Sequence, residues 1–578
     1  MKQYIIKFFN VLSYPILENS KFYVYIFILS AISILLCPYH SSRFYSFIEL
    51  LFDIYLLCAI LCIIHRKYRE IIKNIIYVIF YSLSILDALC YRIMGAPINA
   101  TIYETFSQTN NKEIIEALTA YSSFSILLSP FGVVLLLLLI HIFFHNIQFT
   151  FKKNIAIILS ILAVISAILS IENKRYLYFV LIERQSDDDQ KYQVEFDTLT
   201  KDYLPIYRFA VAIKENHRME KIIKGLDIKA QTVVVDSCSF LSPHIILIIG
   251  ESYNRHHSSL YGYKYKTTPF QEKRKRMGEL VAFSDVISSY NLTNKSFQNM
   301  FSMYEYGSSG NWYEYPLFTV LFKKAGYEVC FFSNQFVTDT SISFSDFIED
   351  VFINNPRLSE KQFSFRNNKL FEYDLDLLDD YCKRVGKRQA PRLSIFHFMG
   401  LHVNFKERYP KSFEHFSANQ YHDSDLSSEE KQTIAEYDNA ILYNDYVIDS
   451  ILNKFKEDDA IAIFVPDHGE MVYDGCHEFG RSLITDSVRV RAHYDIPFWI
   501  WSSKKYRDHH PILWQQVIQA ANRPYMTDQL PHLMLYLGGI SCKDYKANHN
   551  LIHQSFDTLR HRMIKGEVSY EEVMGYEY

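Results

Sequence analysis

Carboxylate and imidazole side chains directly follow three short apolar segments, at the point where each segment ends. They are Glu251 after HIILIIG, Asp467 and His468 after AIAIFVP, and His397 and His402 after LSIF. Carboxylate oxygens and imidazole nitrogens suit a divalent metal, with Zn²⁺ or Mn²⁺ the leading choices. The spacing therefore points to metal-assisted chemistry.

Each of these placements also has a more ordinary explanation. An Asp-His pair is common by chance, and a Glu after a strand is often a helix cap. Three such placements at strand ends together favour a site, because ligands of open α/β sheets bind beyond the carboxyl ends of the strands. The pattern therefore predicts one metal site on the rim of a sheet.

The segments that carry these residues lie in a region where short apolar runs alternate with helical patterns. The predicted strands are 244–250, 328–334, 393–400, 460–469 and 496–501. Strands that alternate with helices predict a mostly parallel sheet with helices on both faces. We expect this α/β domain to span residues 243–578.

The first third of the chain has a different composition. Five apolar runs are long enough, or nearly long enough, to cross a bilayer: 22–38, 46–64, 71–90, 124–144 and 154–171. A removable signal peptide fits poorly, because 21 residues precede the first run and four more runs follow it. Residues 1–171 are therefore predicted to form a transmembrane domain of five helices.

Positive charges set the expected orientation of these helices. Arg66, Lys67 and Arg69 lie between the second and third runs, and Lys73 lies at the start of the third, so this loop should be cytoplasmic. Five crossings from a cytoplasmic amino terminus place everything after residue 171 outside the cytoplasm. The charged stretch 172–242 is expected to be a bridging helical linker.

The overall charge excludes some classes of protein. Lys and Arg total 60 and Asp and Glu total 64, a formal net charge of −4, so no basic field for nucleic acid covers the chain. Hydrophobic residues make up 49% and charged residues 21%, which excludes a disordered chain. The concentration of apolar residues in the first third excludes a soluble protein of a single compartment.

Longer segments around these residues resemble a known family. HIILIIGESYNRHHSSLYGYKYKTTP, SNQ, HFMGLHVNFKERYP, YDNAILYNDYVIDSIL, PDHGE and YDIPFWIW resemble the signatures of the alkaline-phosphatase/sulfatase superfamily, in its membrane phosphoethanolamine transferase branch. The resemblance covers nearly the whole chain, including the five apolar runs. It implies a five-helix transmembrane domain followed by a sulfatase-like catalytic domain.

The resemblance also implies the roles of particular residues. Glu251, Asp467 and His468 match the family's metal ligands, which usually hold zinc. Thr293, seven residues before Met300, stands where the family has its nucleophile, which is also a metal ligand. Ser288, Ser289 and Ser296 in the same loop are the alternatives to Thr293.

Two further histidines match family positions. His402 and His477 correspond to histidines that bind substrate or a second metal, and His397 is a further candidate. The sequence departs from the family at several points: Val403-Asn404 replaces the usual Gly-Pro, and His477 lies in CHEFG rather than beside a glycine. Because of these departures, the resemblance alone does not assign the acceptor molecule or the role of His477.

The implied reaction moves phosphoethanolamine from phosphatidylethanolamine to an envelope acceptor, with lipid A or the lipopolysaccharide core as the leading choice. A covalent Thr293 intermediate would link two half-reactions. The alternatives are a phosphoglycerol transferase of the lipoteichoic-acid-synthase type and an inactive envelope sensor. A soluble sulfatase is disfavoured because the chain contains no Cys-x-Pro-x-Arg.

The same resemblance implies where the protein works. We expect a monomer in the bacterial inner membrane, with the catalytic domain in the periplasm and no nucleic-acid partner. The loop 91–123 is expected to lie on the outer membrane surface as an amphipathic helix. Asn110 and Glu113, in its polar part, would contact the donor headgroup.

Overall fold

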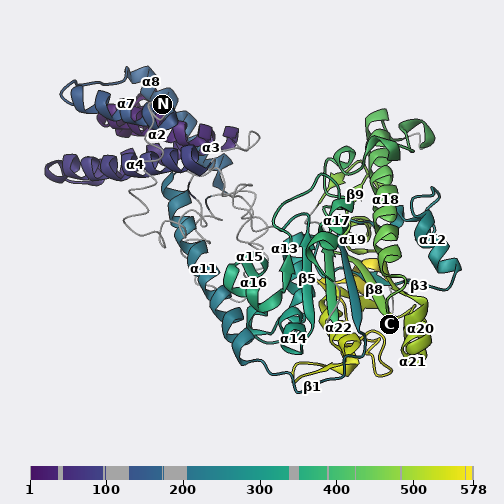
Figure 1. Cartoon of the computed structure of the whole chain (residues 1–578). Helices are drawn as coiled ribbons and strands as arrows, with labels where there is room; N and C mark the ends of the chain where they lie inside the picture. The colour runs from purple at the N-terminus through teal and green to yellow at the C-terminus, as the bar shows by residue number, and fades with distance from the viewer. Residues whose placement is uncertain are drawn as a thin grey trace. The chain divides into compact units, whose positions relative to one another are not determined.

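The computed structural model describes residues 2–36, 43–94, 98, 129–171, 174, 205–336, 351–386, 390–422, 425–481, 485–566 and 568–575. The chain divides into two compact units (Figure 1). The first unit is Met1–Glu220 with Thr340–Ile348, and the second is Lys221–Asp339 with Glu349–Tyr578. Most of the loop 91–123, including Asn110 and Glu113, and most of the stretch 172–204 lie outside the described residues.

The described part of the first unit is helical. All five predicted apolar runs contain a helix, and a further helix, α1, precedes them. The helices are α1 (Lys2–Glu18), α2 (Ser20–Leu36), α3 (Arg43–Ile63), α4 (Arg66–Met94), α7 (Pro130–Phe143) and α8 (Lys153–Leu169). The start of the fourth run, up to residue 128, lies outside the described residues.

Not every one of these helices is long enough to span a membrane alone. Among the described residues, α3 and α4 have the length and apolar composition to cross, and α1 with α2, bent by 68° at their junction, would make a third span. Helices α7 and α8 have 14 and 17 residues, fewer than the about 20 that a hydrocarbon core requires. The structure thus shows two or three candidate spans where the sequence predicted five.

Acidic side chains inside the apolar helices are paired. Asp87 is buried and forms an ion pair with Arg208, and Lys174 lies 2.7 Å from Asp53 and 3.5 Å from Glu49. Burying a charge is costly unless a partner neutralises it. These pairs connect the apolar helices to segments that follow them in the chain.

The second unit contains a seven-stranded sheet in the order β3-β11-β8-β2-β7-β5-β6. The strands are β2 (His244–Gly250), β3 (Leu280–Phe283), β5 (Glu328–Ser333), β6 (Phe365–Arg366), β7 (Arg392–His397), β8 (Ala460–Pro466) and β11 (Phe498–Ser502). Strand β11 runs opposite to the other strands of this sheet and pairs antiparallel with both β3 and β8. The prediction of a mostly parallel sheet is confirmed, although β11 turns it into a mixed one.

Strand β2 shows why the sheet is covered on both faces. All seven of its residues are buried, and alternate residues point to opposite faces. Leu247 belongs to a core under α14 (Phe318–Lys324) and α22 (Leu530–Gly538), whereas Ile248 belongs to a second core with α17 (Leu375–Arg384) and α18 (Ser428–Phe455). Figure 1 shows α18 and α14 on opposite sides of the strands.

The remaining elements complete the layers around the sheet. The other helices are α11 (Pro205–Thr232), α12 (Pro269–Arg276), α13 (Thr293–Phe301), α15 (Val351–Asn354), α16 (Pro356–Gln362), α19 (Ser487–Tyr494), α20 (Lys504–His509), α21 (Pro511–Gln519) and α23 (Tyr570–Met574). Four small strand pairs are β1 (Ser237–Cys238) with β13 (Ile540–Ser541), β4 (Val286–Ile287) with β12 (Tyr525–Met526), β9 (Met471–Val472) with β10 (Phe479–Gly480), and β14 (Met563–Ile564) with β15 (Val568–Ser569).

Candidate metal centre

The register of the central strands places the first two predicted ligands side by side. Strands β2 and β8 are parallel neighbours, with Gly250 opposite Pro466, and the N–H of Asp467 donates to the carbonyl of Gly250 at 3.1 Å. The residues that follow, Glu251 and Asp467, therefore leave the sheet at the same edge. The prediction that strand ends would bring these carboxylates together is confirmed.

Thr293 joins them as the first residue of α13. Its Oγ1 lies 3.2 Å from Glu251 Oε2 and 3.4 Å from His468 Nε2. Ligand atoms of Glu251, Asp467 and His468 all lie within 4.8 Å of one another, and all three residues are buried. The four residues from the sequence thus form one cluster, which we call the metal centre.

The backbone aims Asp467 into this cluster. Its Oδ1 accepts hydrogen bonds from the N–H groups of Ser252 (3.1 Å) and His468 (2.8 Å). Its Oδ2 is buried, accepts no hydrogen bond from the residues that the structure describes, and lies 3.2 Å from His468 Nε2. Burial and the negative charge of Glu251 raise the pKa of Asp467 well above its ordinary value.

The tautomer of His468 suits a metal ligand. Its Nδ1–H donates to the carbonyl of Gly469 at 2.7 Å, so the lone pair of the neutral ring lies on Nε2. Burial and the nearby Arg481 lower the pKa of His468 to about 3, which keeps the ring neutral at pH 7. A neutral imidazole nitrogen beside an unpartnered carboxylate oxygen is a donor pair that a divalent metal fits.

Close backbone packing requires a glycine after His468. A Cβ atom on Gly469 would lie 2.2 Å from the carbonyl oxygen of Ala492. Only glycine fits at this position. The close packing holds the Gly469 carbonyl in place, and this carbonyl accepts the hydrogen bond from His468 Nδ1.

Gln335 holds Glu251, the candidate ligand that follows β2. Its Nε2 donates to Glu251 Oε2 at 2.9 Å and to the carbonyl of Phe398 at 2.8 Å. Sequence reasoning gave Gln335 no role, but it follows β5 at the same edge of the sheet, so the strand-end rule could have found it. Burial would raise the pKa of Glu251, but His468, His402 and Arg481 hold it below its ordinary value.

Two of the predicted histidines, His402 and His397, lie in different surroundings. His402 is half-buried and follows Leu401, whose N–H donates to the carbonyl of Glu251 at 3.2 Å. His397 is fully buried, where its Nδ1 lies 2.9 Å from Ser333 Oγ and its ring packs on Phe297. The structure therefore places His397 in the core and not among the converging ligands.

His477 also lies apart from the four converging residues. Its side chain is exposed, and Nδ1 lies 3.0 Å from Glu430 Oε1. Among the alternative nucleophiles, Ser296 donates its hydroxyl to the carbonyl of Tyr290 at 3.0 Å. Of the hydroxyls considered, Thr293 is the one in contact with Glu251.

Arg481 was missed by sequence reasoning. The pairing of β9 with β10 folds the segment after His468 back, so that Arg481 Nη1 lies 3.3 Å from His468 Nε2. Arg481 Nε lies 3.8 Å from Glu470 Oε2. No regular element or spacing connects residue 481 with the metal centre, so the sequence carried no signal for it.

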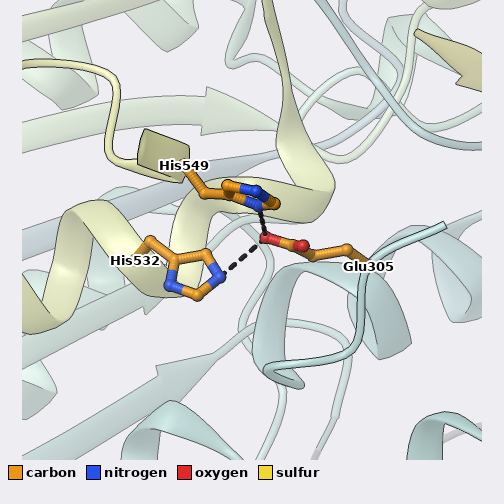
Figure 2. Close-up of side chains that lie close together, drawn as sticks. All are labelled: Glu305, His532 and His549. Atoms are coloured by element: carbon orange, nitrogen blue, oxygen red, sulfur yellow. Dashed lines mark hydrogen bonds and ion pairs between the residues drawn. The ribbon is translucent and has the colours of Figure 1, made fainter. Parts of the chain in front are cut away.

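Glu305, His532 and His549 form a second cluster of potential metal ligands (Figure 2). Glu305 Oε1 lies 2.7 Å from His532 Nε2 and pairs with His549 Nδ1. The N–H of Lys546 donates to His532 Nδ1 at 3.2 Å, and burial lowers the pKa of His532. The proton of this neutral ring must then lie on Nε2, so the nitrogen that faces Glu305 has no lone pair for a metal.

The second cluster is better described as an ion-pair network. Lys546 Nζ lies 3.0 Å from Glu305 Oε2, so three cationic or N–H groups surround one buried carboxylate. Glu305 lies in the segment after α13, His532 lies in α22, and His549 ends η10 (Ala547–His549). The network therefore fastens the segment that follows Thr293's helix to the carboxyl-terminal part of the chain.

Comparisons with known proteins identify the family of the region that contains this site. The family model described as Sulfatase matches residues 243–540, more than half of the chain. The phosphoethanolamine transferase EptC of Escherichia coli O18:K1:H7 (strain RS218 / NMEC) is 31% identical over 320 residues, which cover 54% of this chain and 53% of the relative. The Kdo(2)-lipid A phosphoethanolamine 7''-transferase of Escherichia coli K12 is 25% identical over 310 residues, 53% of this chain and 52% of the relative.

The chain spans about half the length of the curated relatives it matches. Among solved structures, the C-terminal periplasmic domain of EptC from Escherichia coli in complex with Zn is 25% identical, with a TM-score of 0.49, covering 60% of this chain and 98% of that one. The match of the Sulfatase model confirms the resemblance seen in the sequence, and the chain belongs to the sulfatase family.

Proposed function

We propose that the protein transfers phosphoethanolamine from phosphatidylethanolamine to an acceptor in the cell envelope, through a covalent intermediate on Thr293. The observation that carries this proposal is the position of the Thr293 hydroxyl, within 3.4 Å of both Glu251 and His468 at the start of a helix. Curated relatives named phosphoethanolamine transferases support the choice of headgroup.

Glu251, Asp467 and His468, with Thr293, would hold the metal. The unpartnered Asp467 Oδ2 and the lone pair on His468 Nε2 support a divalent ion, and mixed oxygen and nitrogen donors favour Zn²⁺, with Mn²⁺ as the alternative. When bound, such an ion would lower the pKa of the Thr293 hydroxyl and offset charge on the phosphate oxygens.

The first half-reaction forms a bond between Thr293 Oγ1 and the phosphorus of the donor. As this bond forms, the Thr293 hydroxyl gives up its proton to solvent. The bond from phosphorus to the diacylglycerol oxygen breaks, and diacylglycerol leaves with one proton, so the half-reaction balances. His402, half-buried and next to Leu401, which bonds the backbone of Glu251, is the proposed source of that proton, because an imidazole group can serve as a general acid. Gln335 and the backbone N–H groups at Asp467 keep the ligands in place during the attack.

The second half-reaction regenerates Thr293. An acceptor oxygen attacks the phosphoethanolamine–threonine, and the Thr293 oxygen leaves and is protonated. Lipid A or the lipopolysaccharide core is the proposed acceptor, because one curated relative is named for transfer to Kdo(2)-lipid A. Two half-reactions through one enzyme form predict ping-pong kinetics.

The proposed site of action is the bacterial inner membrane. In this proposal residues 1–171 cross it five times as a transmembrane domain, 172–242 is the bridging linker, and 243–578 is the catalytic domain in the periplasm of a monomer. The loop 91–123, with Asn110 and Glu113, would present the donor, and His477 would contact the substrate from the rim of the site.

The test is a transfer assay with two labelled donors. Purified full-length protein should release diacylglycerol from phosphatidylethanolamine and label lipid A, but should leave phosphatidylglycerol uncleaved. Preference for phosphatidylglycerol would favour the phosphoglycerol transferase instead. Absence of cleavage of either donor, with the metal bound, would favour an inactive sensor.

A further inference from the structure

Arg481 brings a permanent positive charge to the metal centre. Its Nη1 lies 3.3 Å from His468 Nε2, and its side chain is 28% exposed. Two carboxylates lie nearby: Glu470, 3.8 Å from Nε, and Glu251, whose pKa Arg481 lowers. The charge of Arg481 is thus directed at the cluster that would hold the metal.

Arg481 contacts the nitrogen of His468 that a metal ion would need. Guanidinium groups only donate hydrogen bonds, and His468 Nδ1–H already donates to the carbonyl of Gly469. The Arg481 N–H therefore points at the one lone pair of His468, on Nε2. The Thr293 hydroxyl lies 3.4 Å from the same nitrogen. A metal ion that takes the lone pair would have to displace the Arg481 N–H from it.

Electrostatic repulsion also makes the binding of a metal ion oppose the Arg481 contact with His468. A divalent cation on Glu251, Asp467 and His468 would repel a guanidinium held a few ångströms away in a buried site. An anion between the two cations removes the repulsion. The planar fork of arginine matches two oxygens of a phosphate group, and arginine favours this bidentate geometry.

We infer that Arg481 couples the binding of metal to the binding of phosphate: it competes with the metal for His468 until a phosphate group takes up its N–H donors. This inference rests on the metal centre of the proposed function and adds a role for a residue outside it. Coupling between two ligands is reciprocal, so phosphate should strengthen zinc binding by the factor by which zinc strengthens phosphate binding.

The test measures zinc affinity in purified full-length protein, by competition with a chromophoric chelator, without and with saturating inorganic phosphate. In the unaltered protein phosphate should tighten zinc binding about tenfold, within the usual range of coupling between sites. In Arg481→Gln, zinc should bind more tightly than in the unaltered protein when phosphate is absent, and phosphate should add nothing. Arg481→Lys, which keeps the charge but loses the fork, should retain only part of the coupling.

Arg489→Gln is the matched control. Arg489 lies eight residues after Arg481 and pairs with Glu478 and Asp486. Its replacement should leave the coupling unchanged. Weaker zinc binding in Arg481→Gln without phosphate would overturn the inference and assign Arg481 to support of the ligands. Equal phosphate coupling in Arg481→Gln and the unaltered protein would also overturn it.

The outcome is separable from that of the proposed function. If phosphatidylethanolamine is cleaved but the coupling survives in Arg481→Gln, only the inference about Arg481 falls. If the coupling disappears in Arg481→Gln but neither donor is cleaved, the inference stands and the proposed transfer falls.

Discussion

At the scale of single residues, proton positions separate the two clusters of potential ligands. His468 donates from Nδ1 to a carbonyl and keeps its lone pair toward Asp467. His532 instead accepts at Nδ1, so the proton of its neutral ring lies on Nε2, 2.7 Å from Glu305 Oε1. Both clusters contain buried histidine and carboxylate groups, so composition alone would rank them equally. The partner of the second ring nitrogen makes the first a candidate metal centre and the second an ion-pair network.

Replacement of Asp467 by asparagine tests the metal centre at this scale. A neutral amide is a poorer ligand than a carboxylate, so Asp467→Asn should lose bound zinc. Donor cleavage should fall by at least about a hundredfold, since changes outside the ligand shell alone cost about 10–100-fold. Elemental analysis and the donor assay measure the two effects.

Asp508→Asn serves as the control, because Asp508 is exposed and pairs only with the nearby Lys504 among the described residues. Full zinc content in Asp467→Asn would contradict the assignment of Asp467 as a ligand.

At the scale of elements, a buried charge network holds the loop after β8. His257 lies between Asp438, 2.8 Å from Nδ1, and Asp474, 3.1 Å from Nε2. Asp474 also accepts from the N–H of Val472. The network joins α18, the segment after β2 and the segment after β8, which carry or flank Glu251 and Asp467.

This network should make stability depend on pH. Burial would lower the pKa of His257, but Asp474 and Asp438 raise it to about 10. A raised pKa stabilises the fold fully below the unfolded pKa of about 6.5, and the stabilisation is lost as pH rises toward 10. His257→Gln should therefore cost about 3 kcal/mol at pH 6 and distinctly less at pH 9.

Denaturant unfolding at the two pH values measures this difference, with the exposed His509→Gln as the control. An equal loss of stability at both pH values would show that His257 acts by packing and not by charge.

The ion-pair network at Glu305 gives a second prediction for elements. Glu305→Gln weakens the contacts to His532, His549 and Lys546, so the free energy of unfolding should fall by about 2–3 kcal/mol, while zinc content stays unchanged. Glu407→Gln, at a largely exposed carboxylate, should change neither quantity. Loss of a bound metal in Glu305→Gln would contradict the proton assignment at His532.

The sequence predicted the parts of the site that follow from strand ends. Glu251, Asp467 and His468 follow buried strands, so the edge of the sheet collects them without further information. Arg481 could not be found, because only the two-residue pairing of β9 with β10 returns it to His468. His397 was misplaced because it is the last residue of β7, where its side chain points into the core and not over the edge.

At the scale of the whole molecule, the chemistry and the apolar helices lie in different compact units. Thr293 and the three candidate ligands belong to the second unit, whereas the helices α1–α4, α7 and α8 belong to the first. The described helices supply two or three candidate spans. Each unit has its own core, so the roles of the two units can be measured separately.

A chain beginning at residue 215 tests this division. It should fold, bind zinc and cleave a small soluble phosphodiester about as well as the full-length protein. Cleavage of bilayer phosphatidylethanolamine should fall strongly, because membrane attachment supplies effective concentration and orientation. The measurement is the ratio of the two activities in each form of the protein. Equal losses on both substrates would mean that the first unit supports the active site, and no loss on either would make it an anchor alone.

The central claim is that Thr293 carries the phosphoethanolamine, and mass spectrometry of the protein tests it most directly. Full-length protein incubated with phosphatidylethanolamine, without acceptor, should gain the mass of one phosphoethanolamine group, and peptide mapping should place it on Thr293. Thr293→Ala should gain no mass and lose transfer by at least about a thousandfold, whereas Ser296→Ala, in the same helix, should still be modified. Modification of a different residue, or full transfer by Thr293→Ala, would contradict the account.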